Sequence, residues 1–160
     1  MIFVTVGSML PFDRLIRVMD EWASRHPEHE LFAQTGDGTY KPKNFPSVRM
    51  LSPTEFAECV EKTVVLVAHA GTGSIITALE VGRPIVILPR LAANREHTTD
   101  HQLHTVEYFG HREGVFTAMT DAEIDDAMER AMAYRSDDNR LLSTSAPEPF
   151  LARIRNFLAT

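Results

Sequence analysis

The stretch TVVLVAHAGTGSIITALEVGRPIVILP, residues 63–89, decides the fold class. It opens with an apolar, β-branched run that predicts a strand buried on both faces. A loop of small residues and a short helix over about 74–81 follow, and Gly82 and Pro84 end that helix. The apolar run at 85–89 predicts the next strand. Strand, helix and strand in this order indicate a parallel pair joined by a crossover connection.

The same alternation continues on both sides of this stretch. Short apolar runs predict four more strands, at 2–6, 29–35, 47–51 and 114–119. Apolar spacing and capping signals predict helices at about 11–22, 52–61, 97–109, 120–134 and 147–158. SPTE at 52–55 and TDAE at 120–123 both match the capping box, in which a side chain at each end of the motif bonds a backbone N–H. The segment 135–149 is the one linker-like part of the sequence.

These elements predict an α/β domain over residues 1–160, built on one Rossmann-like, doubly wound and mostly parallel sheet. Right-handed crossovers predict the strand order 3-2-1-4-5-6. The winding direction reverses between strands 1 and 4, and ligands bind in the crevice beside such a reversal. Gly7 and Ser8 follow strand 1, and residues 69–74 follow strand 4. We therefore expect these two glycine-containing loops to face each other across a binding site.

Composition narrows the class of protein. The chain has 160 residues, 44% of them hydrophobic and 24% charged, as in soluble globular proteins. Its net charge of −6 argues against a nucleic-acid partner. No run approaches the roughly 18 apolar residues of a membrane span, and no basic leader precedes the first apolar run. Cys59 has no partner for an internal disulfide, and we expect a core thiol rather than a nucleophile in a cytoplasmic protein.

The small-residue loop has the features of a phosphate site. Gly71 and Gly73 allow the backbone to approach a ligand closely, and Thr72 and Ser74 add hydroxyl groups. The helix that follows presents free N–H groups at its positive end, so the loop fits a diphosphate. The alternative is a tight turn in which glycine serves packing alone. The P-loop pattern and the full dinucleotide fingerprint are both absent, and we expect no cofactor.

Polar residues gather after the fifth predicted strand, in EHTTDHQLH at 96–104. His97 and His101 are four residues apart, so a helix would place them on one face. They suit either a zinc site or a polar rim that faces a sugar. H-E-x-x-H and Asp-x-Asp are absent, which favours the rim, and we expect no metal. Glu80 could accept hydrogen bonds from ribose hydroxyls, or it could be a solvated charge near the end of a helix.

The sequence contains no G-x-S-x-G motif, which argues against a serine hydrolase.

Three motifs in sequence resemble a known family. They are VTVGSMLPFDRLI at 4–16, HAGTGSIITALEVGRPIVILPR at 69–90 and EHTTDHQL at 96–103. Together they resemble the C-terminal, donor-binding domain of family 28 glycosyltransferases over residues 1 to about 110. Within that family they are most similar to the small catalytic subunits of two-component UDP-sugar transferases, which serve dolichol-linked glycan, capsule and exopolysaccharide synthesis.

The resemblance implies one half of a GT-B glycosyltransferase. The other Rossmann-like half would belong to a membrane-anchored partner subunit that binds a lipid-linked acceptor, which places this chain peripherally at the inner face of the membrane. The implied roles are diphosphate binding by Gly71, Thr72, Gly73 and Ser74, ribose binding by Glu80, uracil binding by the backbone of residues 49–51 with Met50 and Leu51, sugar contact by Asp100 and Gln102, and lining of the cleft by Gly7 and Ser8. For His69 a phosphate contact and a bond to the backbone both remain open.

The predicted function is transfer of a hexose, an N-acetylhexosamine or a uronic acid from a UDP-sugar to a lipid-linked acceptor. The acceptor hydroxyl needs a general base, for which His97, Asp100, His101 and the partner subunit are candidates. One alternative is a regulatory module that binds a UDP-sugar without transferring it. Another is a homo-oligomeric nucleotide-sugar epimerase, which would require an NAD fingerprint that the sequence lacks.

Overall fold

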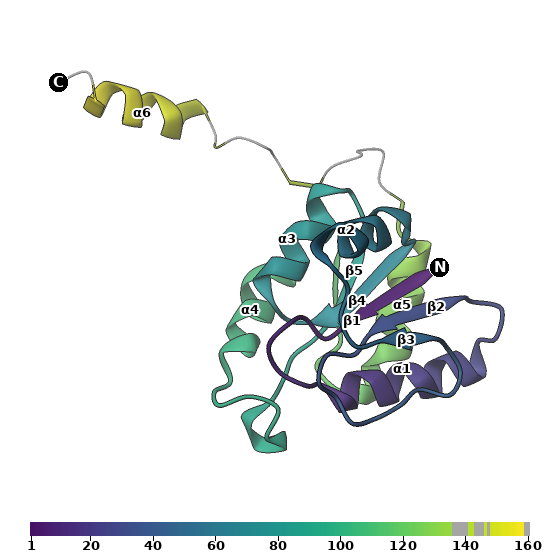
Figure 1. Cartoon of the computed structure of the whole chain (residues 1–160). Helices are drawn as coiled ribbons and strands as arrows, with labels where there is room; N and C mark the ends of the chain where they lie inside the picture. The colour runs from purple at the N-terminus through teal and green to yellow at the C-terminus, as the bar shows by residue number, and fades with distance from the viewer. Residues whose placement is uncertain (136–140, 143–145, 147, 159–160) are drawn as a thin grey trace.

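Parallel strands form a single sheet in the computed structural model, which describes residues 1–135, 141–142, 146 and 148–158. The strands are β1 (Ile2–Thr5), β2 (Leu31–Gln34), β3 (Ser47–Val48), β4 (Val65–His69), β5 (Ile85–Leu88) and β6 (Val115–Thr117). Their order across the sheet is β3-β2-β1-β4-β5-β6, and every neighbouring pair is parallel (Figure 1). The predicted α/β class, the sheet and the strand order are confirmed.

Helices cover both faces of the sheet. They are α1 (Asp13–Arg25), α2 (Pro53–Lys62), α3 (Thr72–Glu80), α4 (His101–Phe109), α5 (Ile124–Ala133) and α6 (Glu148–Leu158), with short 3-10 turns η1 (Ala92–Asn94) and η2 (Asp121–Glu123). The core side chains of α1 and α5 pack against one face, and those of α2, α3 and α4 pack against the other (Figure 1). The sheet is therefore doubly wound, as predicted.

Successive residues of the central strands feed the two cores in turn. In β4, Val65 and Val67 join the α1–α5 core, while Leu66 and Ala68 join the α2–α4 core. All four are buried, and burying a side chain such as valine or leucine contributes about 1.5–3 kcal/mol. Cys59 lies half-buried against the second core, and burial raises the pKa of its thiol. Because both faces are covered, the strands read as continuous apolar runs.

Two predicted boundaries near the crevice need correction. β3 ends at Val48, because the carbonyl of Arg49 accepts from Gly36 and the N–H of Leu51 donates to the side chain of Gln34. The strand predicted over 47–51 is thus shorter. The helix predicted over 97–109 begins at residue 101, because carboxylates bond the backbone N–H groups of the loop before it.

The two predicted capping boxes have different outcomes. At α2, Ser52 accepts the N–H of Glu55 and the Glu55 carboxylate accepts the N–H of Ser52, so this box is confirmed. The box at 120–123 is wrong. Glu123 accepts the Thr120 hydroxyl and the N–H of Met119, and the η2 turn precedes α5. The carboxylate therefore bonds the residue before the expected cap.

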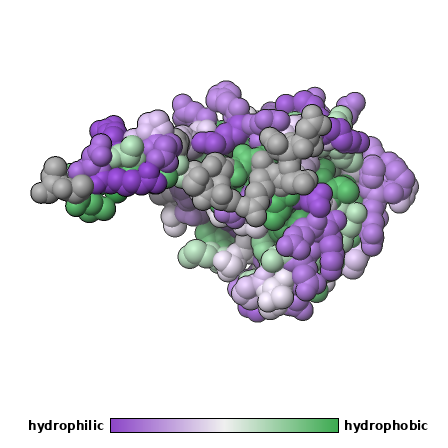
Figure 2. Space-filling model, turned by 90° about the horizontal axis from the view of Figure 1, so that it is seen from above, coloured by the Kyte–Doolittle hydropathy of each residue, from purple (hydrophilic) through white to green (hydrophobic). Residues whose placement is uncertain are grey.

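The C-terminal helix α6 follows the predicted linker, most of which lies outside the described residues. None of its described side chains is buried, and it projects from the body of the fold (Figure 1). Figure 2 shows hydrophilic and hydrophobic residues together on its surface. Its large exposed apolar residues are Phe150, Ile154, Phe157 and Leu158. Among the described residues, no helix combines the length and the apolar character needed to cross a bilayer.

Candidate functional site

The loop after β1 lies at the carboxyl edge of the sheet, beside the point between β1 and β4 where the direction of winding reverses. Gly7 has a φ of +79°, a left-handed conformation that favours glycine. Its N–H donates to Thr5 Oγ1 at 3.1 Å, and its carbonyl accepts from Gln34 Nε2 at 3.2 Å. Ser8 and Met9 lie exposed beyond it. The loop is therefore held at its base and open at its tip.

The loop after β4 leads directly into α3. Gly71 is the N-cap residue, and no side chain caps the helix. The helix α3 begins at Thr72, two residues earlier than predicted, so Gly73 and Ser74 lie in its first turn. The amides of a first turn have no partner within the helix and lie at its positive end. This end of α3 therefore suits an anionic group such as a diphosphate.

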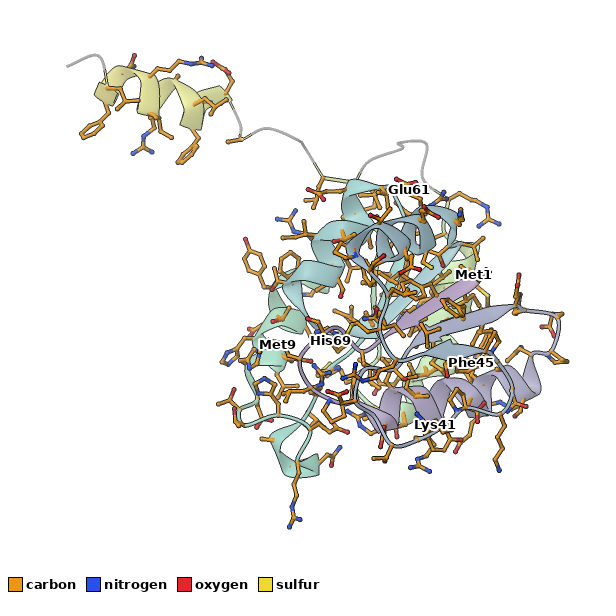
Figure 3. The ribbon with its side chains drawn as sticks, in the orientation of Figure 1. Met1, Met9, Lys41, Phe45, Glu61 and His69 are labelled. Atoms are coloured by element: carbon orange, nitrogen blue, oxygen red, sulfur yellow. The ribbon has the colours of Figure 1, made fainter. Side chains whose placement is uncertain are left out.

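His69 lies between the two loops, at the end of β4. A Cβ added at Gly7 would lie 2.6 Å from Cε1 of His69, and a Cβ added at Gly71 would overlap the same ring from the other loop. A side chain at either position would therefore collide with the imidazole in its present place. Figure 3 shows His69 and Met9 on one side of the molecule and Met1 on the opposite side. The two loops predicted to face each other do so across a histidine.

Burial keeps the His69 imidazole neutral. Burial is the largest cause, and together with the electrostatic effects of Arg90, His101 and His97 it lowers the pKa of His69 to about 4. The Nδ1 atom is buried and has no hydrogen-bond partner among the described residues. The alternative in which a backbone group bonds Nδ1 is therefore not observed. A neutral imidazole has one N–H donor and one acceptor, so the ring can bond a ligand that enters the crevice.

The loop between β5 and α4 is held by its own side chains. Three consecutive backbone N–H groups each donate to a side chain that comes later in the loop or helix. The pairs are Arg90 to Gln102 Oε1 at 2.9 Å, Leu91 to Glu96 Oε2 at 2.9 Å and Ala92 to Asp100 Oδ1 at 2.8 Å. Gln102 is 3% exposed, whereas Asp100 is exposed. Of the two predicted sugar contacts, Asp100 alone presents its side chain to solvent.

Arg14 clamps this loop to α1. Its Nε and Nη2 atoms donate to both Glu96 carboxylate oxygens, at 2.6 and 2.9 Å. Nη2 also donates to the carbonyl of Pro89, and Nη1 donates to Asp121. Burial opposes the charge, but the bonds with Glu96 and Asp121 prevail and raise the pKa of Arg14. A bidentate pair of this kind sets the geometry of the loop as well as its stability.

His97 and His101 come together although they do not share a helix. His97 lies in the loop before α4, and His101 begins the helix. Their rings contact edge to face, with centroids 4.3 Å apart. The Thr99 hydroxyl lies 2.9 Å from Nδ1 of His101 and fixes that ring. No group of three or more histidine, cysteine, aspartate or glutamate side chains within the described part of the chain could hold a metal ion.

The segment predicted to hold a uracil ring lies beside the first loop. Met50 is 42% exposed, and Leu51 is half-buried. The N–H of Leu51 donates to Gln34 Oε1 at 2.9 Å, and Gln34 also bonds the Gly7 carbonyl. One buried amide therefore links the proposed uracil segment to the Gly7 loop.

Glu80 lies far from the two glycine loops for a residue that is predicted to bind the ribose of the same nucleotide. It is the last residue of α3 and is exposed, and no described residue bonds its side chain. Eight residues separate it from Thr72, which is about 12 Å along a helix axis. A ribose bonded to Glu80 would therefore lie more than two turns from the first amides of the helix. Thr77 shares that face one turn nearer to the loop.

Sequence reasoning missed Gln34, Arg90 and Glu96, which hold the crevice loops from below. Gln34 and Arg90 are each 3% exposed and end or follow apolar strands. A polar residue at the end of an apolar strand could have indicated such a role, since buried polar groups are normally hydrogen-bonded. A hollow of about 860 Å³ opens at the amino edge of the sheet beside Met1 and Arg83, away from the two glycine loops.

Comparison with known proteins identifies the family. Residues 1–138 match the family described as glycosyltransferase family 28 C-terminal domain. The chain is 29% identical over 123 residues to UDP-N-acetylglucosamine transferase subunit ALG13 of Homo sapiens, covering 71% of this chain and 10% of that protein. The same subunit of Mus musculus is 28% identical over 118 residues, covering 64% and 10%. The chain thus spans about a tenth of the length of these relatives.

Solved structures share the fold. The glycosyltransferase of kitacinnamycin superposes with a TM-score of 0.59 at 18% identity, over 83% of this chain and 35% of that one. The solution structure of ALG13 superposes with a TM-score of 0.58 at 15% identity, over 96% and 93%. The fold is that of one Rossmann-like half of a GT-B glycosyltransferase. Because the family match covers most of its length, the chain belongs to glycosyltransferase family 28, of which it carries the C-terminal domain.

Proposed function

We propose that this chain is the catalytic, UDP-sugar-binding subunit of a two-component glycosyltransferase. The observation that carries the proposal is the pair of glycine loops that enclose His69 at the reversal of the sheet, in a chain of this family. In this proposal the enzyme transfers a hexose, an N-acetylhexosamine or a uronic acid to a lipid-linked acceptor. The name of the human relative supports a UDP-N-acetylglucosamine donor and a subunit role.

The α3 amides stabilise the leaving group in this proposal. Breaking the bond from sugar to phosphate leaves negative charge on UDP. The free N–H groups of the first turn and the positive end of the helix face that charge. His69 is neutral near pH 7 and donates one further hydrogen bond to a phosphate oxygen. Gly7 and Ser8 line the cleft, and the segment at 50–51 holds the uracil ring.

The β5–α4 loop supplies the sugar side of the proposed site. Asp100 is exposed at the start of α4, beside the His97–His101 pair. These three side chains are the candidates for the general base that accepts the acceptor hydroxyl proton, together with groups of the partner subunit. Gln102 supports the loop from within, because its carbonyl oxygen bonds the backbone of Arg90.

Nucleotide titration tests the donor. We expect UDP to bind, and GDP and ADP to bind at least tenfold more weakly, because purine rings do not match a uracil segment. Isothermal titration of the three nucleotides into the purified chain measures the difference. Equal binding of all three would contradict the uracil segment, and absence of UDP binding would contradict the proposed donor.

Reconstitution tests the two-component assignment. The proposed partner is a membrane-anchored protein that binds the lipid-linked acceptor and holds this chain peripherally at the inner face of the membrane. We expect the purified chain alone to show little transfer and the co-expressed pair to transfer labelled sugar from UDP. Full activity of the isolated monomer would contradict a two-component enzyme. UDP binding without turnover in the pair would instead support a regulatory binding module.

A further inference from the structure

Arg90 is a buried cation that bonds carbonyls instead of a carboxylate. It follows β5 and is 3% exposed. Its Nη2 atom donates to the carbonyls of Val6 and Leu10, at 2.7 and 2.5 Å. Its Nε atom is buried without a partner, and no described carboxylate forms an ion pair with it. Burial lowers the pKa of Arg90 to about 10 although the negative charge of Glu96 acts to raise it, and Arg90 stays charged at neutral pH.

The contacts of Arg90 join the β1–α1 loop to the start of α4. Val6 and Leu10 flank the loop that contains Gly7, so one guanidinium nitrogen holds both ends of that loop. The guanidinium carbon also lies 5.0 Å from the centroid of the buried Phe12 ring. The Arg90 backbone N–H donates to the side-chain oxygen of Gln102 in α4. Loss of the side chain would leave two carbonyls without their donor.

We propose that Arg90 is a positioning residue that fixes the β1–α1 loop and keeps a buried positive charge, with no carboxylate bonded to it, close enough to His69 to act on its imidazole. An anion that enters between the glycine loops would then meet a buried charge with no carboxylate in contact to neutralise it, in a region where charges are weakly screened. This effect on a diphosphate rests on the proposed function, whereas the contacts of Arg90 with the loop do not.

A ligand-free measurement tests the charge. The positive charge of Arg90 contributes to the low pKa of His69. We therefore expect Arg90→Met to raise the pKa of His69 above its wild-type value of about 4, as followed by NMR titration of the imidazole between about pH 3 and 8. Arg90→Lys retains a charge and should leave the pKa of His69 near that of the wild type. An unchanged pKa of His69 in the folded Arg90→Met variant would overturn the inference.

Arg83 provides a matched control. Its Nη2 atom donates to the Glu61 carbonyl at 2.6 Å, and its Nε atom is also buried without a partner. It lines the hollow at the amino edge of the sheet, whereas His69 ends β4 at the carboxyl edge. Arg83→Met loses similar contacts, so we expect it to leave the pKa of His69 and the affinity for UDP unchanged. A shift of the pKa of His69 equal to that of Arg90→Met would overturn a specific role of Arg90.

Comparison of UDP with uridine tests the effect on anions. We expect Arg90→Met to weaken UDP binding by about tenfold and to leave the weaker binding of uridine unchanged, because uridine carries no phosphate. Equal losses for both ligands would show a general structural role and overturn the charge effect. If Arg90→Met does not fold, Arg90→Lys must keep the preference for UDP over uridine. If the wild type does not bind UDP but the pKa of His69 shifts, the proposed function fails and the role of Arg90 stands.

Discussion

At the scale of single residues, the crevice depends on an imidazole that two glycines accommodate. The sequence predicted the glycines and their loops, because spacing after strands is visible in a linear pattern. It left the role of His69 open, because the packing of Gly7 against the end of another strand depends on sheet order and register. The same holds for Gln102, whose amide turned out to bond a backbone N–H inside the fold.

The neutral state of His69 predicts a pH dependence of stability. Its folded-state pKa of about 4 lies below the unfolded value of about 6.5, so the unfolded chain gains the proton first as pH falls. The contribution is present above about pH 6.5 and is lost as pH falls toward 4. Between pH 7 and 5 the loss should be about 2 kcal/mol. Denaturant unfolding of the wild type and His69→Gln at both pH values measures it, and parallel pH profiles would contradict it.

Glu80 and Thr77 form a testable face on α3. If ribose hydroxyls bond Glu80, Glu80→Ala should weaken UDP binding by about tenfold or more, and Glu80→Gln should weaken it less because its amide oxygen still accepts a bond. Thr77→Val is the companion variant, one turn nearer to the loop. Calorimetric titration of UDP compares the three variants. If Glu80→Ala leaves the affinity for UDP unchanged and Thr77→Val lowers it, the ribose site lies at Thr77, one turn nearer to the loop than proposed.

At the scale of elements, the β5–α4 loop shows where helix prediction reached its limit. The sequence pattern predicts a helix from residue 97, yet the carboxylates of Glu96 and Asp100 bond backbone N–H groups of the loop, and α4 starts at His101. Local competition by acidic side chains is a known reason for such an error. The histidine pair still formed, by a loop geometry that helical spacing does not describe.

The Glu96 clamp predicts a measurable loss of stability. Glu96→Ala removes the acceptor of the Leu91 N–H and the partner of Arg14, so we expect the free energy of unfolding to fall by about 2–3 kcal/mol. Chemical denaturation measures the change. Glu58→Ala is the control, because its exposed pair with Lys62 should contribute less than about 0.5 kcal/mol. Equal effects of both variants would contradict a structural role of the clamp.

At the scale of the whole molecule, alternation of strands and helices was enough to predict the fold class, the strand order and the point at which the winding of the sheet reverses. These features follow from periodicity and from the handedness of crossovers, which are general rules. The linking of the crevice loops by Gln34 and Arg90 was not predictable in the same way. Each of these side chains bonds backbone far away in sequence, and that pairing exists only after the sheet has formed.

The projecting α6 predicts that the body is stable without it. No described residue of α6 is buried, whereas Leu141 bonds the Leu79 carbonyl and packs beside Gly114. Deletion of 143–160 should therefore leave the melting temperature within about 2 °C of the wild type. Changes at exposed residues rarely alter the free energy of unfolding by more than about 0.5 kcal/mol. Deletion of 141–160 also removes the Leu141 contacts and should lower the melting temperature. Thermal melts compare the two, and a large loss from the shorter deletion would contradict an independent body.

The shortness of β3 and β6 has a consequence for the behaviour of the protein at high concentration. These outermost strands have two and three residues, and Pro46, just before β3, carries no N–H to donate. An exposed, long edge strand is a template on which a neighbouring molecule can add its own strand and begin a fibril. Edge strands as short as β3 and β6 offer few free backbone groups to a strand of another molecule. We therefore expect this parallel sheet to resist intermolecular strand addition at high concentration.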